Sequence, residues 1–411
     1  MKKLLGVTLG IMTALGGFVD FGQIIFTMQA GALFRYRLLW AIVLGTVAII
    51  TYMEMCGRVA VVAQKTVFVV VRERLGRRFG LVVLIASNLL NLITCAAELG
   101  GIAIVLHLLT GWPEKVVLIA SVPVLWCTIS ALQFEWIERL FGLAGLTMVV
   151  FAISAAQLHP DWAAIVGGVV PRLTSGKPGE GILYWYFAVG IFSAMLMEYE
   201  VHFYSSGAIE EDWKPQDLSE NFSVAAFGSI LGAFLTVALL ALGAIIFSPR
   251  GIFPELLSTT IMAGALPFGK GGLLLALGGT LACLGGAAVE TTLSGAYNYC
   301  QFYNLSWGKN LPAKKVPVFT KSWSAMLGIA MLVDLTGVGP LQLVNISIVF
   351  GMVVMPFTYY PILRVAMDKK IMGRHLNGRG DTALGIAVLG LIILAAIAAI
   401  PLMIVTNFGK P

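Results

Sequence analysis

Seven carboxylate residues lie within otherwise apolar stretches of the chain, where an ionised side chain is costly. They are Asp20, Glu54, Glu98, Glu198, Glu200, Glu290 and Asp334. An ionisable residue at membrane depth marks by default a pathway or binding site for an ion or substrate. Glu54, Glu290 and Asp334 are expected near helix ends, where an interfacial or capping role accounts for them. The other four predict a buried acidic site.

Two short stretches concentrate this chemistry. In GGFVDFGQ (16–23), Asp20 and Gln23 are three residues apart, so both face one way on a helical turn, and the three glycines let backbone approach a ligand closely. The stretch FSAMLMEYEVHFYSSG (192–207) repeats the arrangement, with glutamates in mid-span. Acidic side chains beside free carbonyl oxygens predict a cation site. Hard oxygen ligands suit Mg²⁺, Mn²⁺ or Fe²⁺, whereas a thioether favours softer transition ions.

The same residues have a simpler interpretation, a buried polar network that only holds two helices together. The coincidence of glycine or acidic breaks in both halves of the chain favours the cation site. Tyr199, Tyr204 and His202 follow the second break closely. They could orient ligands or serve only in packing.

The composition requires a membrane protein. Of the 411 residues, 58% are hydrophobic and 12% charged, whereas soluble proteins are usually about 25% charged. The five cysteines are scattered singly, without the spacing of a zinc site or disulfide framework. The net charge of +6 is explained by membrane topology, so no nucleic-acid partner is expected. No cofactor is expected either, apart from a divalent ion as substrate.

A spanning helix needs about 20 mostly apolar residues, and eleven such spans are predicted. Their ranges are 4–29, 38–60, 80–109, 115–132, 140–157, 183–205, 223–247, 271–300, 318–335, 340–363 and 383–405. With the N-terminus in the cytoplasm, 19 of the 27 Lys and Arg residues fall in inner segments and 8 in outer ones. This asymmetry follows the positive-inside rule and predicts an external C-terminus. A cleaved signal peptide is the alternative explanation for MKKLLGVTLGIMTALGG (1–17).

The spans are predicted to form one transmembrane domain, residues 1–411. It would comprise two five-helix repeats, 4–157 and 183–366, and an additional helix at 383–405. Spans 1 and 6 then correspond, and both carry a break. Paired interrupted helices at equivalent places in two repeats indicate a transporter site.

At these residues the chain resembles the Nramp family of proton-coupled divalent-metal transporters. The family's helix 1 motif DPGN corresponds to DFGQ (20–23), and MQAGALFRYRLLW (28–40) is similar to the segment after it. TCAAELGG (94–101) and ETTLSGAYNYCQ (290–301) are similar to family segments in spans 3 and 8. The helix 6 motif A-x-x-MPHN corresponds to AMLMEYE (194–200). The resemblance implies an all-α, LeuT-like fold with a 5+5 inverted repeat, eleven helices, and interrupted helices 1 and 6.

The resemblance also implies metal ligands. They are Asp20, Met197, Gln23 in place of an asparagine, and the backbone carbonyls of Gly17 and Ala194. Two departures alter this set, because Glu198 and Glu200 replace the proline and asparagine of helix 6 and add potential ligands. Phe21 replaces the helix 1 proline, so the break there must rely on glycine.

The expected proton path is also altered. Glu98 matches the family's acidic residue on that path, but Tyr199 replaces its helix 6 histidine and Cys95 its span 3 aspartate. A phenol does not readily exchange a proton at neutral pH. Either His202 or a helix 6 glutamate takes over the proton work, or the metal moves without protons, as in family relatives that carry magnesium.

The sequence therefore predicts a secondary transporter that moves Mn²⁺, Fe²⁺ or Mg²⁺ by alternating access in a bacterial inner membrane. Membrane lipid is an expected partner, because the basic stretch 61–78 suits an anionic surface. The rivals are a LeuT-like carrier of an organic cation or amino acid and a membrane sensor that does not transport. An enzyme is not expected, since HExxH and GxSxG are absent.

Overall fold

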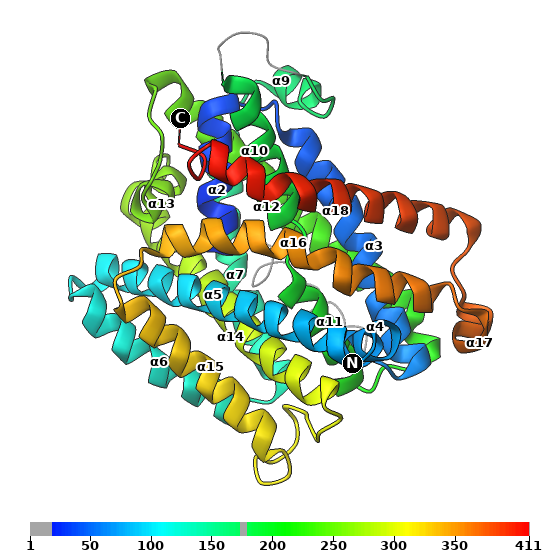
Figure 1. Ribbon diagram of the computed structural model, residues 1–411. Helices are drawn as coiled ribbons and strands as arrows, with labels where there is room; N and C mark the ends of the chain where they lie inside the picture. The colour runs from blue at the N-terminus through cyan, green and yellow to red at the C-terminus, as the bar shows by residue number, and fades with distance from the viewer. Residues whose placement is uncertain (1–18, 173–178, 411) are drawn as a thin grey trace.

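The computed structural model describes residues 19–172 and 179–410, and the regular structure in these ranges is helical (Figure 1). The helices of the first half are α2 (Phe21–Phe34), α3 (Leu39–Ala63), α4 (Val67–Leu75), α5 (Arg77–Thr110), α6 (Glu114–Ala131), α7 (Phe134–Gly145), α8 (Val149–Gln157) and α9 (Trp162–Gly167). The helices of the second half are α10 (Glu180–Ala194), α11 (Glu198–Glu210), α12 (Leu218–Leu242), α13 (Leu257–Ala265), α14 (Gly269–Phe302), α15 (Pro317–Leu335), α16 (Pro340–Ala366), α17 (Lys369–Met372) and α18 (Arg379–Val405).

The predicted spans agree with these helices. In the described residues, 10 helices or consecutive helix pairs are long and apolar enough to cross a membrane. They coincide with the ten spans predicted after the first, although the span predicted at 140–157 already begins at Phe134. Residues 4–18 of the first predicted span lie outside the described part, and its remainder is α2.

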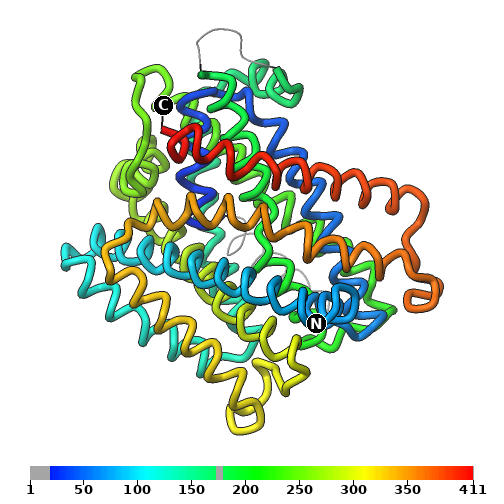
Figure 2. The backbone as a smooth tube through the Cα atoms, in the orientation of Figure 1, coloured from blue at the N-terminus to red at the C-terminus, as the bar shows by residue number. Residues whose placement is uncertain are grey.

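The predicted interruption of the sixth span is confirmed. Helix α10 ends at Ala194 and α11 begins at Glu198, with a short non-helical segment between them. The Leu196 amide donates to the Ser193 carbonyl at 2.9 Å, which tightens the last turn before the break. The tube in Figure 2 shows α10 passing into α11 in the green part of the chain. Two helix ends are thereby brought into the interior of the bundle.

The long helices α5 and α14 form the wall behind these ends. Asn88 on α5 donates to the Gly295 carbonyl, and Cys95 on α5 contacts the Ala288 carbonyl, so the two helices are antiparallel. Helix α16 lies along α5, and α18 lies along α16 on the outside (Figure 1). The site residues on α2, α5, α11 and α14 are therefore enclosed by protein.

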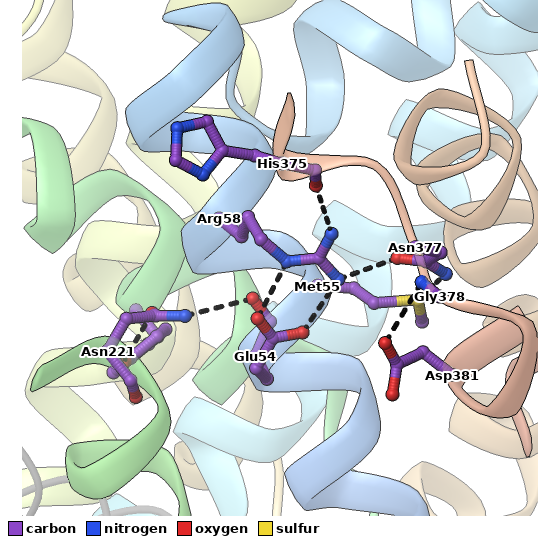
Figure 3. A network of polar contacts seen from close by, with 9 residues as sticks. Glu54, Met55, Arg58, Asn221, His375, Asn377, Gly378 and Asp381 are labelled. Atoms are coloured by element: carbon purple, nitrogen blue, oxygen red, sulfur yellow. Dashed lines mark hydrogen bonds and ion pairs between the residues drawn. The ribbon is translucent and has the colours of Figure 1, made fainter. Parts of the chain in front are cut away.

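An arginine at the end of α3 ties three distant segments together (Figure 3). Arg58 binds both carboxylate oxygens of Glu54, at 2.7 and 2.9 Å, within the same helix. It also donates to the His375 carbonyl and to Asn377 Oδ1 in the segment that joins α16 to α18. Asn221 on α12 donates to the Glu54 carbonyl. Glu54 therefore has a structural role, although it lies inside α3 and not near a helix end as expected.

Candidate metal site

Asp20 is the N-cap of α2, and both of its carboxylate oxygens accept hydrogen bonds. Oδ1 accepts the Gln23 amide at 2.7 Å, and Oδ2 accepts the Tyr199 hydroxyl at 3.2 Å. The residue is only 2% exposed. An aspartate caps a helix in this way because its oxygen satisfies a free amide of the first turn. The cap also fixes the direction of the carboxylate before any ligand arrives.

Glu98 on α5 binds the same helix end. Its two carboxylate oxygens lie 3.2 and 3.3 Å from the amide nitrogen of Phe21, and the residue is fully buried. The Glu98 carboxylate lies close enough to Asp20 for the charge of Asp20 to act on it. The positive end of the α2 dipole partly offsets the cost of holding two carboxylates there. Glu98 therefore helps to hold the start of α2 beside Asp20.

The first turn of α11 presents two glutamates on opposite sides. Two residues along a helix turn by about 200°, so Glu198 and Glu200 cannot face the same partner. Glu198 accepts hydroxyl hydrogen bonds from Ser87 at 2.9 Å and Thr358 at 3.0 Å, both away from α2. Glu200 is fully buried, and its oxygens have no hydrogen-bond partner among the described residues. The charges of Glu290 and Asp20 act on Glu200.

The amide of Gln23 has a free oxygen. Its nitrogen donates to Thr236 Oγ1 at 2.8 Å and lies 3.2 Å from the sulfur of Met195. Its oxygen Oε1 is buried without a partner in the described part of the chain. Because the nitrogen is held, the oxygen is the atom left to bind an ion. The sulfur of Met195 thus lies near this amide, although the sequence analysis did not identify Met195 as a site residue.

The other residues expected around the ion lie at the break between α10 and α11. Ala194 is the last residue of α10, and Met197 is the N-cap of α11. Met197 is buried, yet it does not join the hydrophobic core formed by the described residues, whereas Met195 does. Gly17, whose carbonyl was expected to complete the shell, lies outside the described residues.

The side chain of His202 contacts residues of α14 and α4, and not Asp20. Its Nδ1 lies 3.2 Å from the amide nitrogen of Asn298 on α14, and its ring packs edge-on against Phe68. An amide nitrogen can only donate, so Nδ1 accepts, and the ring proton of the neutral imidazole sits on Nε2. Nε2 has no partner among the described residues. The structure thus places His202 one turn beyond the Tyr199–Asp20 contact, on the α14 side of α11.

The interpretation of Glu290 as a residue near a helix end is wrong. Glu290 lies well inside α14, fully buried, and neither oxygen has a hydrogen-bond partner in the described ranges. Asp334, by contrast, is the penultimate residue of α15, as expected. The signal for Glu290 was present in the sequence, since the predicted span 271–300 already places it ten residues before the end of that span.

Among the described residues, no basic side chain forms an ion pair with this group of carboxylates. The ion pairs found in the described ranges do not include Asp20, Glu98, Glu200 or Glu290. Nor do three His, Cys, Asp or Glu side chains in those ranges form a compact metal-binding cluster. The donors available are mixed: carboxylate, amide oxygen, thioether and backbone carbonyl. Such a mixed set of donors suits a transported ion, because the ion must be released from the site after it has bound.

Comparisons with known proteins show which proteins this chain is similar to. The divalent metal cation transporter MntH of Levilactobacillus brevis is 26% identical over 389 residues, covering 90% of this chain and 83% of that protein. A manganese transporter from Eremococcus coleocola has a similar structure, with a TM-score of 0.79 and 19% identity over 100% of this chain and 89% of that one. MhsT in complex with L-phenylalanine aligns with a TM-score of 0.62 and 16% identity, covering 96% and 98%.

These structural likenesses show an all-α fold of the LeuT-like type, as expected. A sequence model of the family described as natural resistance-associated macrophage protein-like, or Nramp, matches residues 10–401. The match covers the helix starts, the acidic residues and the break described above. The chain therefore belongs to the Nramp family.

Proposed function

We propose that this protein carries divalent metal ions across a bacterial plasma membrane by alternating access. The relatives it matches are divalent metal cation transporters by name, and the similar structure from Eremococcus coleocola is of a manganese transporter. The observation that carries the proposal is that the charge of Asp20, at the start of α2, acts on Glu200 in the first turn of α11, while neither pairs with a basic side chain of the described residues. A divalent cation supplies the missing charge.

The ion would be held by Asp20, Glu200 and the amide oxygen of Gln23. Met197 and the carbonyls of Gly17 and Ala194 would complete its shell. Carboxylate and amide oxygens suit Mn²⁺, Fe²⁺ and Mg²⁺ alike, and a thioether favours the softer Mn²⁺ and Fe²⁺ over Mg²⁺. Glu198 contributes less directly, since its oxygens are engaged by Ser87 and Thr358.

Tyr199 and Glu98 would position the site. The Tyr199 hydroxyl holds one oxygen of Asp20, and Glu98 holds the start of α2 through the Phe21 amide. Hydrogen-bond partners of this kind orient metal ligands and tune their affinity. A proton taken up or released during transport would have to use Glu98, His202 or a helix 6 glutamate.

The test is uptake of Mn²⁺ and of Mg²⁺ into liposomes that contain the purified full chain, with the internal pH recorded at the same time. We expect uptake by the wild-type protein and its loss in Asp20→Ala. Asp161→Ala is the matched control, because Asp161 is also a helix N-cap, at the start of α9, but is exposed and remote from the site. It should transport normally.

The pH record separates the two mechanisms. Acidification that accompanies metal entry indicates proton coupling, and entry without a pH change indicates an uncoupled carrier. Entry of neither ion would contradict the proposal. The alternative, a carrier of an organic cation or amino acid, would then be favoured.

A further inference from the structure

Helix α14 runs beside α11 with matched turns. Ser294 donates to the Tyr199 carbonyl at 2.8 Å, and Gln301 donates to Ser206 at 2.8 Å. Both helices advance by seven residues between these contacts, so they run in the same direction. Glu290 lies one turn before Ser294. It is therefore level with the break that precedes α11, where the candidate metal site lies.

Glu290 lies near this site, because its carboxylate is close enough to act electrostatically on Glu200, as the carboxylate of Asp20 also does. Tyr199, which bonds Asp20, lies within reach of the charges of Asp20, Glu200, Glu98 and Glu290 together. Both oxygens of Glu290 lack a hydrogen-bond partner among the described residues, and the side chain is fully buried. These two oxygens therefore form no hydrogen bond with any described residue of the protein.

Two neighbouring carboxylates without hydrogen-bond partners are unstable as ions in a protein interior, unless protons or a cation neutralise them. Burying one unpaired ionised group costs several kcal/mol, and a second like charge adds repulsion. A structural role would normally supply hydroxyl or amide donors, as Ser87 and Thr358 do for Glu198. Here such donors are missing from the described part of the chain. A bound cation removes both costs.

We propose that Glu290, together with Glu200, binds the transported divalent ion at a second position beside the one formed at Asp20. The inference rests on the proposed function and adds a residue of α14 to its site. The ligands of this position are carboxylate oxygens, which are hard donors and bring two negative charges. They bind Mg²⁺ as well as Mn²⁺. The Asp20 position includes thioether sulfur, so the two positions differ in metal preference.

The experiment is calorimetric titration of the purified full chain in detergent with Mn²⁺ and, separately, with Mg²⁺. Wild type is compared with Glu290→Gln, Glu290→Asp and Asp20→Ala. We expect Glu290→Gln to weaken binding of both ions by about tenfold or more, because one carboxylate charge is lost. Glu290→Asp keeps the charge on a shorter stem and should give an intermediate affinity.

The matched control is Glu211→Gln, which removes one carboxylate just beyond the end of α11, where Glu211 accepts a hydrogen bond from Trp213. It should bind both ions with wild-type affinity. Thermal unfolding without metal provides the check on folding. Glu290→Gln should not lower the melting temperature, since a neutral amide is cheaper to bury than a charge. It should reduce the rise in melting temperature that metal produces in wild type.

The outcomes separate the two proposals. If Asp20→Ala abolishes binding and Glu290→Gln stays within twofold of wild type, the second position does not exist and the proposed function stands. If Glu290→Gln loses binding while Asp20→Ala keeps it, the Asp20 site is wrong and the role of Glu290 holds. A wild-type chain that binds neither ion overturns both.

Discussion

In the proposed site, the carboxylates of Asp20 and Glu200 differ in the number of hydrogen bonds that they accept. Asp20 already has a donor on each oxygen, one from the backbone of its own helix and one from Tyr199. Glu200 has none in the described part of the chain. An ion arriving between them would find the first ligand oriented and the second free to move towards it. The Tyr199 hydroxyl is the contact that makes this difference.

Tyr199→Phe is expected to weaken Mn²⁺ binding by about tenfold, in the range seen when hydrogen-bond partners of metal ligands are removed. The ring stays, so packing is preserved, and only the donor to Asp20 is lost. Calorimetric titration of the full chain with Mn²⁺ measures the effect. Tyr186→Phe is the matched control, because the buried Tyr186 hydroxyl has no partner among the described residues. Equal affinities in the two variants would show that the hydroxyl of Tyr199 does not orient Asp20.

At the scale of elements, the position of Asp20 depends on how closely α2 approaches α12. A methyl group added to Gly31 would lie 2.1 Å from the Leu240 carbonyl oxygen, and one added to Gly243 would lie 2.3 Å from the Met28 carbonyl oxygen. The two backbones therefore meet with only hydrogen atoms between them, as at small-residue contacts in membranes. Gly243 begins a π-helical turn, Gly243–Phe247, that continues α12. The contact holds α2, and with it Asp20, in place.

Gly31→Ala should destabilise the protein by about 1–3 kcal/mol, the usual cost of overpacking. Alanine ordinarily favours a helix, so a loss of stability would reflect the close contact and not helix propensity. Thermal unfolding in detergent measures it. Gly328→Ala on α15 is the control, since a methyl group there meets nothing within 4 Å. A Gly31→Ala protein as stable as this control would mean that the helices can separate without cost.

At the scale of the whole molecule, the Arg58 network joins the segment after α16 to α3 and α12 (Figure 3). The Arg58 side chain is 10% exposed and that of Glu54 is 22% exposed. The same segment has a second ion pair, Arg74 with Asp368 at 2.9 Å, which is nearer the solvent. A shielded pair with several hydrogen bonds is costly to break, whereas an exposed pair contributes little. The first network should therefore hold the segment.

Arg58→Ala is expected to lower stability by about 2 kcal/mol, less than for a fully buried pair because Glu54 keeps some access to solvent. Hydrogen exchange of residues 367–378 should rise at the same time. Arg74→Ala, the control, should change stability by less than about 1 kcal/mol. If both variants behave alike, the contacts of Arg58 do not anchor this segment.

Much of the fold follows from local properties of the sequence. In lipid every backbone amide and carbonyl must be bonded within the segment, so a long apolar stretch can only become a helix. This is why the ten spans after the first were predicted correctly, and why the polar residues around Glu198 marked the break in the sixth. The family resemblance rested on motifs at those same places. The membrane class and the helices were thus determined by sequence alone, and the same patterns selected the acidic residues of the proposed site.

The tertiary structure decided which side chains of that site can meet. Glu198 and Glu200 are the same residue type two positions apart, and only the neighbours of α11 distinguish them. Ser87 and Thr358 donate hydrogen bonds to Glu198, whereas Glu200 has no such donor among the described residues and lies near the charge of Glu290. Glu290 lies 90 residues from Glu200 in sequence, and the role proposed for it depends on the alignment of α14 with α11. That alignment is set by packing between distant segments. No local pattern encodes it, because the free energy of each contact depends on both helices at once.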